Sequence, residues 1–273
     1  MPLAVRYLVE CLLSTHQASL GPMGKGVTSR EESAAAIQAA YYERTAASYD
    51  ATHVRVGDEH FVAAQYLSYL VDGLNIRSLL DVGAGTGRAI KFLRERHPGL
   101  RVAGIEPVQA LIDQAVDGGL DSGIIALGRG EALPFQDGAF DAVCEFGALH
   151  HVSNPKAVVG EMIRVAKRAV FLSDSNRFGQ GGRPHRFVKL ALASAHLWGF
   201  ANWVKTRGKR YSMSEGDGLG YSYSVFDSLP TLMTWADRII LVPTLTDKAV
   251  TGLYHPLLTS RHLLIGAIKE ANQ

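Results

Sequence analysis

The chain has 273 residues, of which 47% are hydrophobic and 20% charged, with a formal net charge of +2. This length suits one large domain, or one domain with an insertion, in a protein of ordinary soluble composition. The small charge does not favour a nucleic-acid partner. Two separated cysteines, Cys11 and Cys144, provide neither a disulfide framework nor a cysteine-based zinc site, and we expect a cytoplasmic protein.

The first twenty residues, "MPLAVRYLVECLLSTHQASL", are apolar but include Arg6 and Glu10. We expect an amphipathic helix rather than a secretory signal, and a surface through which the chain forms a homo-oligomer. A linker rich in glycine, serine and charge follows. Helices are predicted over 34–49 and 59–74, so that residues 1–74 form N-terminal helices and a lid. No stretch reaches the roughly 18 uncharged apolar residues of a membrane span.

Strands and helices then alternate through residues 75–174. Short apolar strands separated by amphipathic helices indicate βαβ units in a parallel sheet covered on both faces. Two more strands in residues 236–273 complete this core. The predicted strands are 78–82, 101–106, 122–128, 140–147, 168–174, 238–243 and 262–269, and the predicted helices of the core are 87–96, 108–116 and 155–166.

The alternation stops in residues 175–235. We interpret this region as an insertion that caps the carboxyl edge of the sheet and binds the substrate. No Asp or Glu lies between Asp174 and Glu215, while eight Lys and Arg do. We interpret the apolar stretch "LALASAHLWGFANWV" as a buried lid helix. Three other interpretations of this region stay open: a pocket for the substrate, recognition of an anionic substrate, and peripheral contact with an acidic membrane surface.

Three glycines in "LLDVGAGTGRAI" separate a strand from a helix, where they permit tight turns and close approach to a ligand. The spacing is G-x-G-x-G, with Arg88 where a dinucleotide-binding loop has its third glycine. Asp81 ends the strand and favours a ligand with a positive group over a pyrophosphate. Glu106 ends the next strand, where it can accept both hydrogen bonds of a ribose diol.

The motifs "LLDVGAGTGRAI", "GIEP", "GEALPFQDGAFDAV" and "ALHHV", in this order, resemble the class I S-adenosylmethionine-dependent methyltransferases. The resemblance covers about residues 41–175 and is strongest to the group with ubiquinone-type, menaquinone-type and natural-product enzymes. It implies an α/β, Rossmann-like sheet of seven strands whose last strand is antiparallel. It also implies S-adenosylmethionine as the cofactor of a methyltransferase.

The same resemblance assigns the residues around the cofactor. Asp81 and the three glycines surround the methionine part of the cofactor, and Glu106 holds the ribose. Glu145 begins the segment that passes under the sulfonium, residues 131–133 pass beside the adenine, and two tyrosines cover the site. The implied residues are Tyr42, Tyr49, Asp81, Gly83, Gly85, Gly87, Glu106, Pro107, Glu131, Ala132, Leu133 and Glu145. Arg129 departs from the family pattern, which often has an adenine-binding Asp there. Arginine cannot accept that hydrogen bond, and we expect it to point into solvent, with stacking on the adenine as the alternative.

Two adjacent histidines, His150 and His151, follow the fourth strand of the core. Successive residues of an extended chain point to opposite sides, so we predict that the pair does not share a metal, and we assign no metal ligands. His150 is the predicted catalytic residue in the pocket, with His151 as the alternative. A base is required only where the acceptor must lose a proton that it does not lose unaided.

We predict acceptor contacts from residues after the fifth core strand and in the stretch "RYSMSEGDGLGYSYSVFD", for which a flexible surface loop is an equal alternative. The predicted acceptor-binding residues are Asp174, Asn176, Tyr211, Tyr221 and Tyr223. The acceptor is expected to be a small or lipophilic molecule. Two other functions stay open: the same cofactor used for cyclisation or rearrangement, and a non-catalytic cofactor-binding partner subunit.

Overall fold

The structure is a computed structural model that describes residues 29–50, 57–246 and 255–270. The predicted first helix and the oligomer surface assigned to it lie outside these residues. No helix within the described ranges is both long and apolar enough to cross a membrane.

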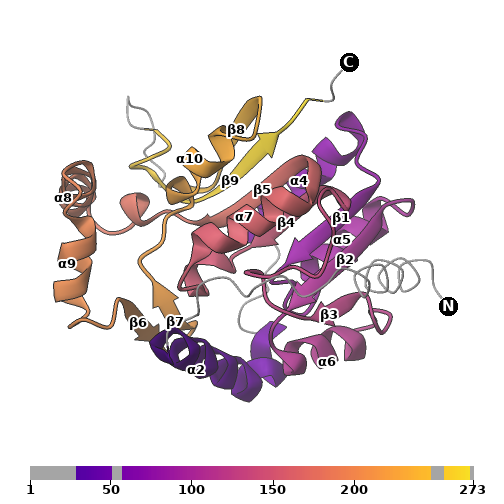
Figure 1. The fold of residues 1–273 in the computed structure, drawn as a ribbon, viewed down its shortest axis with the longest axis horizontal. Coiled ribbons are helices and arrows are strands. Elements are labelled where there is room, and N and C mark those ends of the chain that lie inside the picture. Colours follow the sequence, from indigo (N-terminus) through magenta and orange to yellow (C-terminus); the bar gives the residue numbers. More distant parts are fainter. Residues whose placement is uncertain (1–28, 51–56, 247–254, 271–273) are drawn as a thin grey trace.

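Seven strands form one sheet, which runs through the middle of the molecule (Figure 1). Five neighbouring strands are parallel, and the strand that comes last in the chain is antiparallel to both of its neighbours. The predicted Rossmann-like sheet with an antiparallel last strand is therefore confirmed. In sheet order the strands are β3 (Ile125–Leu127), β2 (Arg101–Glu106), β1 (Ser78–Val82), β4 (Phe140–Phe146), β5 (Ala166–Ser175), β9 (Ser260–Ile268) and β8 (Arg238–Thr246).

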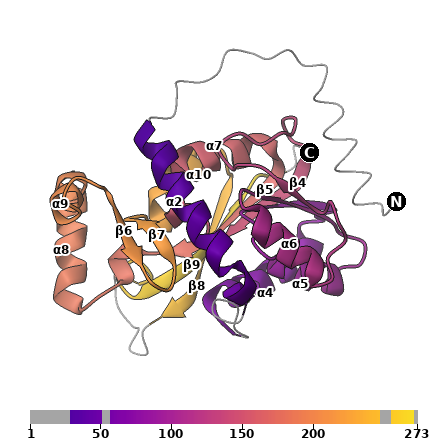
Figure 2. The ribbon, with the colours of Figure 1, turned by 90° about the horizontal axis from the view of Figure 1, so that it is seen from below.

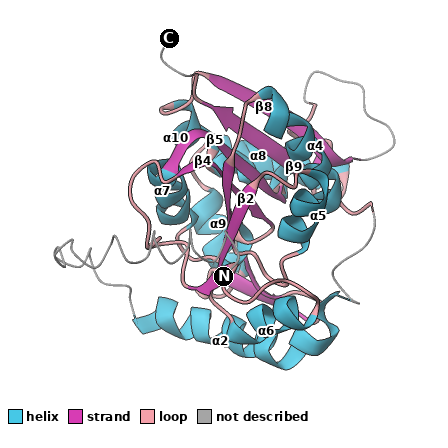
Figure 3. Cartoon of the chain, turned by 90° about the vertical axis from the view of Figure 1, so that its right-hand side faces the viewer, coloured by secondary structure: helices cyan, strands magenta, loops and turns pink. Residues whose placement is uncertain are grey.

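Helices cover both faces of the sheet, and the core divides accordingly into two apolar clusters. One face carries α4 (Glu59–Gly73), α5 (Arg88–Arg96) and α6 (Gln109–Asp117); the other carries α7 (Pro155–Val165) and α10 (Leu229–Met233) (Figure 3). Strand β1 is buried along its whole length because apolar side chains pack against both of its faces.

Local signals place the helix ends. Asp58 accepts a hydrogen bond from the backbone N–H of Phe61 at the start of α4, and Asn154 does the same for Ala157 at the start of α7. Near the amino terminus, α2 spans Ser29–Thr45 and continues as a 3-10 helix over Ala46–Ser48. The predicted helix 34–49 thus begins five residues too late.

The apolar stretch between β5 and β8 is not the predicted buried lid helix. It divides into α8 (Arg183–Ser194) and α9 (Trp198–Lys205), with His196 in the left-handed region between them at φ 58°. No residue of α9 is buried, and 67% of Phe200 is exposed. The two helices lie at one side of the molecule, away from the sheet (Figure 1), so their apolar side chains have no core to enter.

The polar stretch that follows forms a hairpin of β6 (Tyr211–Ser214) and β7 (Gly218–Tyr221). The hairpin lies beside α2 (Figure 2). Gly218 has φ 71°, and a Cβ atom there would lie 2.5 Å from Gln38 Oε1 on α2. Glycine at this position therefore permits both the turn and the close contact with α2.

Candidate active site

The glycine loop joins β1 to α5 at the carboxyl edge of the sheet. Gly83, Gly85 and Gly87 all have positive φ, at 76°, 54° and 73°. A Cβ atom on Gly85 would have no neighbour within 4 Å, so the loop is open there to a ligand. By contrast, a Cβ atom on Gly87 would lie 2.2 Å from Leu120 Cδ1.

The position of Gly87 does not support the expected contact with a ligand. It borders neither of the cavities described below; it ends the loop and lets α5 pack closely on the segment after α6.

Three buried carboxylates surround this loop: Asp81, Glu106 and Glu145. Glu106 accepts hydrogen bonds from the backbone N–H of Gly85 at 2.9 Å and of Val108 at 3.0 Å. Burial nevertheless raises the pKa of Glu106 to about 7. Among the described residues, none of the three acids forms an ion pair with a lysine or arginine.

Asp81 and Glu145 are held by few donors. Burial raises the pKa of Asp81 to about 7, and its described hydrogen-bond partner is the Cys144 thiol at 3.7 Å. Burial, followed by the charge of Asp174, raises the pKa of Glu145 well above its usual value. Ala148 N–H donates to one oxygen of Glu145, while the other, Oε1, is buried without a partner.

Two cavities meet at this loop. The first, here called the acidic cavity, has a volume of about 410 Å³ and includes Glu106, Pro107, Glu131 and Glu145 in its wall. The second, the basic cavity, has a volume of about 540 Å³ and extends from Asp81 to α8 and α9. Residues that border both cavities are Tyr42, Tyr49, Gly83, Gly85, Phe146, Gly147, His151 and Tyr221.

Only one residue of the predicted adenine segment borders a cavity. Glu131 borders the acidic cavity, but Ala132 and Leu133 do not. Leu133 packs in the apolar cluster around α7, and its backbone bonds to Glu161 and Arg164. Arg129 is exposed, as expected; it also borders the cavity and pairs with Glu131 at 3.0 Å.

Tyr42 and Tyr49 lie between the cavities with their rings edge to face, 5.7 Å apart. The Tyr42 hydroxyl is 3.0 Å from Nε2 of His151. Burial and the charge of Glu106 raise the pKa of Tyr49 to about 12. Both phenols therefore stay neutral near pH 7, since burial raises the pKa of Tyr42 as well.

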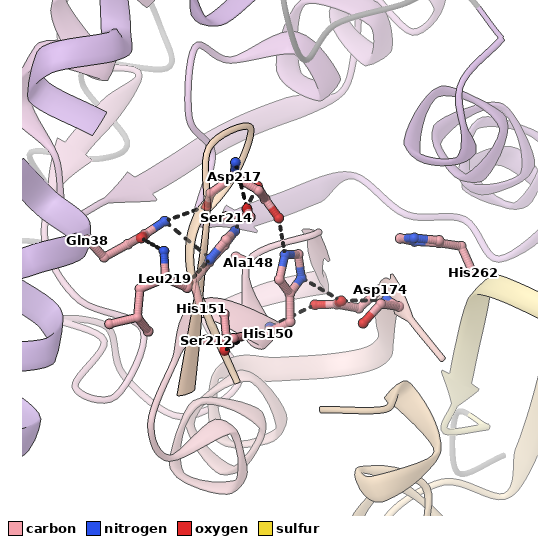
Figure 4. Close-up of polar contacts among 12 residues, drawn as sticks. Gln38, Ala148, His150, His151, Asp174, Ser212, Ser214, Asp217, Leu219 and His262 are labelled. Atoms are coloured by element: carbon pink, nitrogen blue, oxygen red, sulfur yellow. Dashed lines mark hydrogen bonds and ion pairs between the residues drawn. The ribbon is translucent and has the colours of Figure 1, made fainter. Parts of the chain in front are cut away.

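The two histidines do not point to opposite sides, so that prediction is wrong. Gly147, at φ 80°, ends the extended chain, and residues 149–151 form a 3-10 helix in which the rings of His150 and His151 lie 4.0 Å apart. Both contact Asp217, in the turn of the hairpin (Figure 4). His151 is held further by the carbonyl of Leu219 at 2.6 Å.

His150 lies between two carboxylates. Its Nδ1 is 2.8 Å from Asp174 Oδ1, and its Nε2 is 3.2 Å from Asp217 Oδ2 (Figure 4). Burial by itself lowers the pKa of His150, but the charges of Asp174 and Asp217 outweigh burial and raise this pKa well above its usual value. This arrangement favours the imidazolium form of His150, because each ring nitrogen then donates to a carboxylate.

Two of the predicted acceptor residues hold the site together instead. Asp174 is fully buried and accepts hydrogen bonds from the backbone and ring of His150 and from Ser175 N–H. Asn176 is also fully buried; its amide donates to the carbonyls of Leu257 and Ser260 and accepts from Phe178 and Ser224. Neither borders a cavity, because all of these bonds point into the protein.

The three predicted tyrosines differ in position. Tyr221 borders both cavities, and Tyr223 borders the basic cavity while its hydroxyl bonds to Ser228 at 2.7 Å. Tyr211 borders neither, and packs edge to face against Tyr221.

Sequence reasoning left Gln38 unassigned and included Asp217 only as part of the hairpin stretch from which acceptor contacts were expected. Gln38 accepts from Leu219 N–H at 2.6 Å and ties α2 to the hairpin that carries Asp217. A cluster of Glu59, His60 and His262 in the wall of the basic cavity was also missed. These residues come from distant parts of the chain, and no local pattern marks them.

Two groups among the described residues bring potential metal-binding atoms within 4.8 Å of one another: Glu59 with His60 and His262, and His150 with His151 and Asp217. The second group shows that adjacent histidines can converge here. The prediction that the two histidines share no metal stays a prediction.

Comparison with known proteins identifies the core of the chain. Residues 80–172 match a family model described as the methyltransferase domain. An uncharacterized methyltransferase of Mycobacterium tuberculosis is 35% identical over 91 residues, which are 33% of this chain and 36% of that protein. Demethylmenaquinone methyltransferase of Thermotoga maritima is 29% identical over 99 residues, 36% of this chain and 43% of that enzyme. The match thus spans well under half of either relative.

The fold is shared over a larger part of the chain. The crystal structure of Burkholderia thailandensis 1,6-didemethyltoxoflavin-N1-methyltransferase, with bound 1,6-didemethyltoxoflavin and S-adenosylhomocysteine, has a TM-score of 0.53 to this one. The alignment covers 92% of this chain and 95% of that protein at 15% identity. At this identity the similarity concerns the fold.

Proposed function

Residues 80–172 are a methyltransferase domain with the class I S-adenosylmethionine-dependent fold, and from this premise we propose that the protein transfers a methyl group from S-adenosylmethionine to a small-molecule acceptor. The observation that carries the proposal is the set of buried acids around the glycine loop. Asp81, Glu106 and Glu145 are buried and form no ion pair with a described lysine or arginine, so their charged forms are costly unless a ligand compensates.

A ligand with a diol and positive groups fits these acids. The Glu106 carboxylate is oriented by two backbone N–H groups, and its remaining lone pairs can accept from a ribose diol. Asp81 is available to an ammonium group, and the unpartnered Oε1 of Glu145 to positive charge. Gly85 leaves room for the ligand to approach the backbone. When bound, S-adenosylmethionine supplies the methyl group and its leaving group.

The acceptor belongs in the basic cavity, because this cavity shares a wall with the acidic one at Gly83, Gly147 and Tyr221. Its wall is largely polar, and the exposed apolar residues Phe200 and Trp203 are not part of it. Of the two acceptor types expected from the sequence, these observations support a small polar molecule over a lipophilic one.

His150 is the residue that accepts the acceptor's proton where one must be lost. Asp174 fixes the tautomer and orientation of the ring through Nδ1, which leaves Nε2 for the acceptor once Asp217 withdraws. Withdrawal of the Asp217 charge also lowers the pKa of His150, so that Nε2 can lose its proton and act as a base.

Isothermal titration with S-adenosylmethionine and with S-adenosylhomocysteine tests the cofactor. Both should bind, and the Glu106→Ala variant should bind roughly tenfold or more weakly, since it loses charge-assisted hydrogen bonds. The matched control is Asp113→Asn on the exposed surface of α6, which should bind normally. Binding of a nicotinamide cofactor in place of both sulfur compounds would contradict the proposal.

Mass spectrometry of the products tests the reaction. Methyl transfer adds about one CH₂ to the acceptor at each turnover and produces S-adenosylhomocysteine. A product isomeric with its substrate would instead show that the fold and cofactor serve cyclisation or rearrangement.

A further inference from the structure

The part of the basic cavity that lies against α8 and α9 is lined by four cations, each from a different segment. Arg177 comes from the 3-10 helix after β5, Lys189 from α8, Lys205 from the end of α9, and Arg210 from the start of the hairpin. Three acids also border the cavity: Glu59 at the start of α4, Asp81 in β1, and Asp217 in the turn of the hairpin.

These cations crowd one another. The Nζ atom of Lys189 donates to the carbonyls of Arg177 at 2.8 Å and Gln180 at 3.0 Å, which leaves one of its three N–H bonds. Burial and the charges of Lys205, Arg186 and Arg177 all lower the pKa of Lys189. An anion placed here would relieve this repulsion.

Two buried donors in the same wall have no acceptor among the described residues. These are the Nε–H of Arg177 and the Nε1–H of Trp198. They are neighbours, because the Arg177 guanidinium lies 5.6 Å from the centre of a Trp198 ring. The two terminal nitrogens of Arg177 donate to Asp227 and to the carbonyl of Ser222, so the position of this side chain does not depend on a ligand. Buried donors without an acceptor are rare in folded proteins and point to a missing partner.

We infer that Arg177, Lys189 and Trp198, with Lys205 and Arg210 around them, bind an anionic group of the methyl acceptor, a carboxylate or a phosphate. This inference rests on the proposed function, since the same cavity reaches the glycine loop and His150. The acceptor is then anchored by its anion beside α8 and α9, and its reactive part extends toward His150.

Binding of three small aromatic probes tests this site. Benzoate, phenyl phosphate and the neutral benzyl alcohol are titrated into the full-length protein saturated with S-adenosylhomocysteine. At least one anion should bind about tenfold or more tightly than benzyl alcohol, and its affinity should fall as KCl is raised. The tighter of the two anions identifies the carboxylate or the phosphate as the preferred group.

Substitutions locate the binding. Lys189→Gln keeps donors to the two carbonyls but removes the charge, and Trp198→Phe keeps the ring but removes the N–H. Each should weaken anion binding at least severalfold without changing the affinity for S-adenosylhomocysteine. Lys209→Gln, an exposed charge outside the cavity, is the matched control and should have no effect. Thermal melts confirm that each variant is folded.

Equal affinity for the anions and benzyl alcohol would overturn the inference, as would equal losses in Lys189→Gln and Lys209→Gln. Failure of the proposed function is a separate result, because it shows as absence of S-adenosylhomocysteine binding in the unsubstituted protein.

Discussion

At the scale of single residues, the role proposed for His150 depends on the charges around it. Asp174 lies at its Nδ1 and Asp217 at its Nε2, and the two differ in kind. Asp174 is fully buried in the strand layer, whereas the side chain of Asp217 is half exposed in a hairpin turn. Asp174 therefore belongs to the permanent site, and Asp217 is the carboxylate that an acceptor can displace.

Asp217→Asn should shift the pH dependence of methyl transfer. Removing this negative charge lowers the pKa of His150, so the basic form becomes available at lower pH. We expect the acidic limb of the kcat/KM profile to move down by roughly one pH unit. Glu215→Gln in the same turn is the control. An unmoved limb would show that His150 is not the base.

Asp81→Asn should change how stability depends on pH. Burial raises the pKa of Asp81 from 3.8 to about 7, so the folded state binds more protons than the unfolded state between these values. Stability of the ligand-free protein should therefore fall as pH rises from about 4 to about 7, and Asp81→Asn should reduce that fall.

Melting temperatures measured at several pH values without cofactor test this, with the exposed Asp113→Asn as the control. The fall should not vanish entirely, because burial raises the pKa of Glu106 to about 7 too. An identical slope in Asp81→Asn and the unsubstituted protein would show that folding does not raise the pKa of Asp81.

At the scale of elements, the pair α8 and α9 presents an unusual surface. Phe187, Val188, Phe200, Trp203 and Val204 are all exposed, on helices whose segment has many basic residues and no acidic ones. Apolar residues beside basic ones are typical of helices that lie on anionic membranes. The expectation of peripheral membrane contact therefore stays a prediction, now assigned to these helices.

We predict that the protein co-sediments with vesicles containing phosphatidylserine more than with vesicles of phosphatidylcholine alone. Phe200→Ser combined with Trp203→Ser should reduce this binding severalfold, since the apolar contact is lost. Tyr69→Ser, an equally exposed aromatic on α4, is the matched control. The prediction fails if the control and the double variant sediment alike.

At the scale of the whole molecule, the two cavities share walls built from segments that lie far apart in the sequence. Tyr42 and Tyr49 come from the region of α2, and Tyr221 comes from the hairpin. Gln38 joins these two elements through its bond to Leu219. Binding in the acidic cavity should therefore order segments that lie far apart in sequence.

Hydrogen–deuterium exchange with and without S-adenosylhomocysteine tests this coupling. Amide exchange should slow in α2, in the glycine loop and in the hairpin 211–221, because local opening of each then requires ligand release. Helix α10, which borders neither cavity, should be unchanged. Protection confined to the glycine loop would show that α2 and the hairpin do not close on the ligand.

Most of the sheet was predictable from the sequence because its signals are local. Strands such as 78–82 and 101–106 are short apolar runs between helical periods, and their observed bounds are identical. The placement of Glu106 in the wall of the acidic cavity follows from the same alternation, because parallel strands bring their carboxyl ends to one edge.

The tertiary structure decided the rest. Asp217 lies 67 residues after His150, and Gln38 lies 181 residues before its partner Leu219, so no local pattern links them. Gly87 and Leu133 match a motif, yet packing against Leu120 and around α7 takes them away from the cavities. By itself, the sequence determined the sheet and the acids at its edge, through periodicity and strand ends. Only long-range packing decided which carboxylates contact His150. It also decided which donors beside α8 and α9 are left without a partner among the described residues.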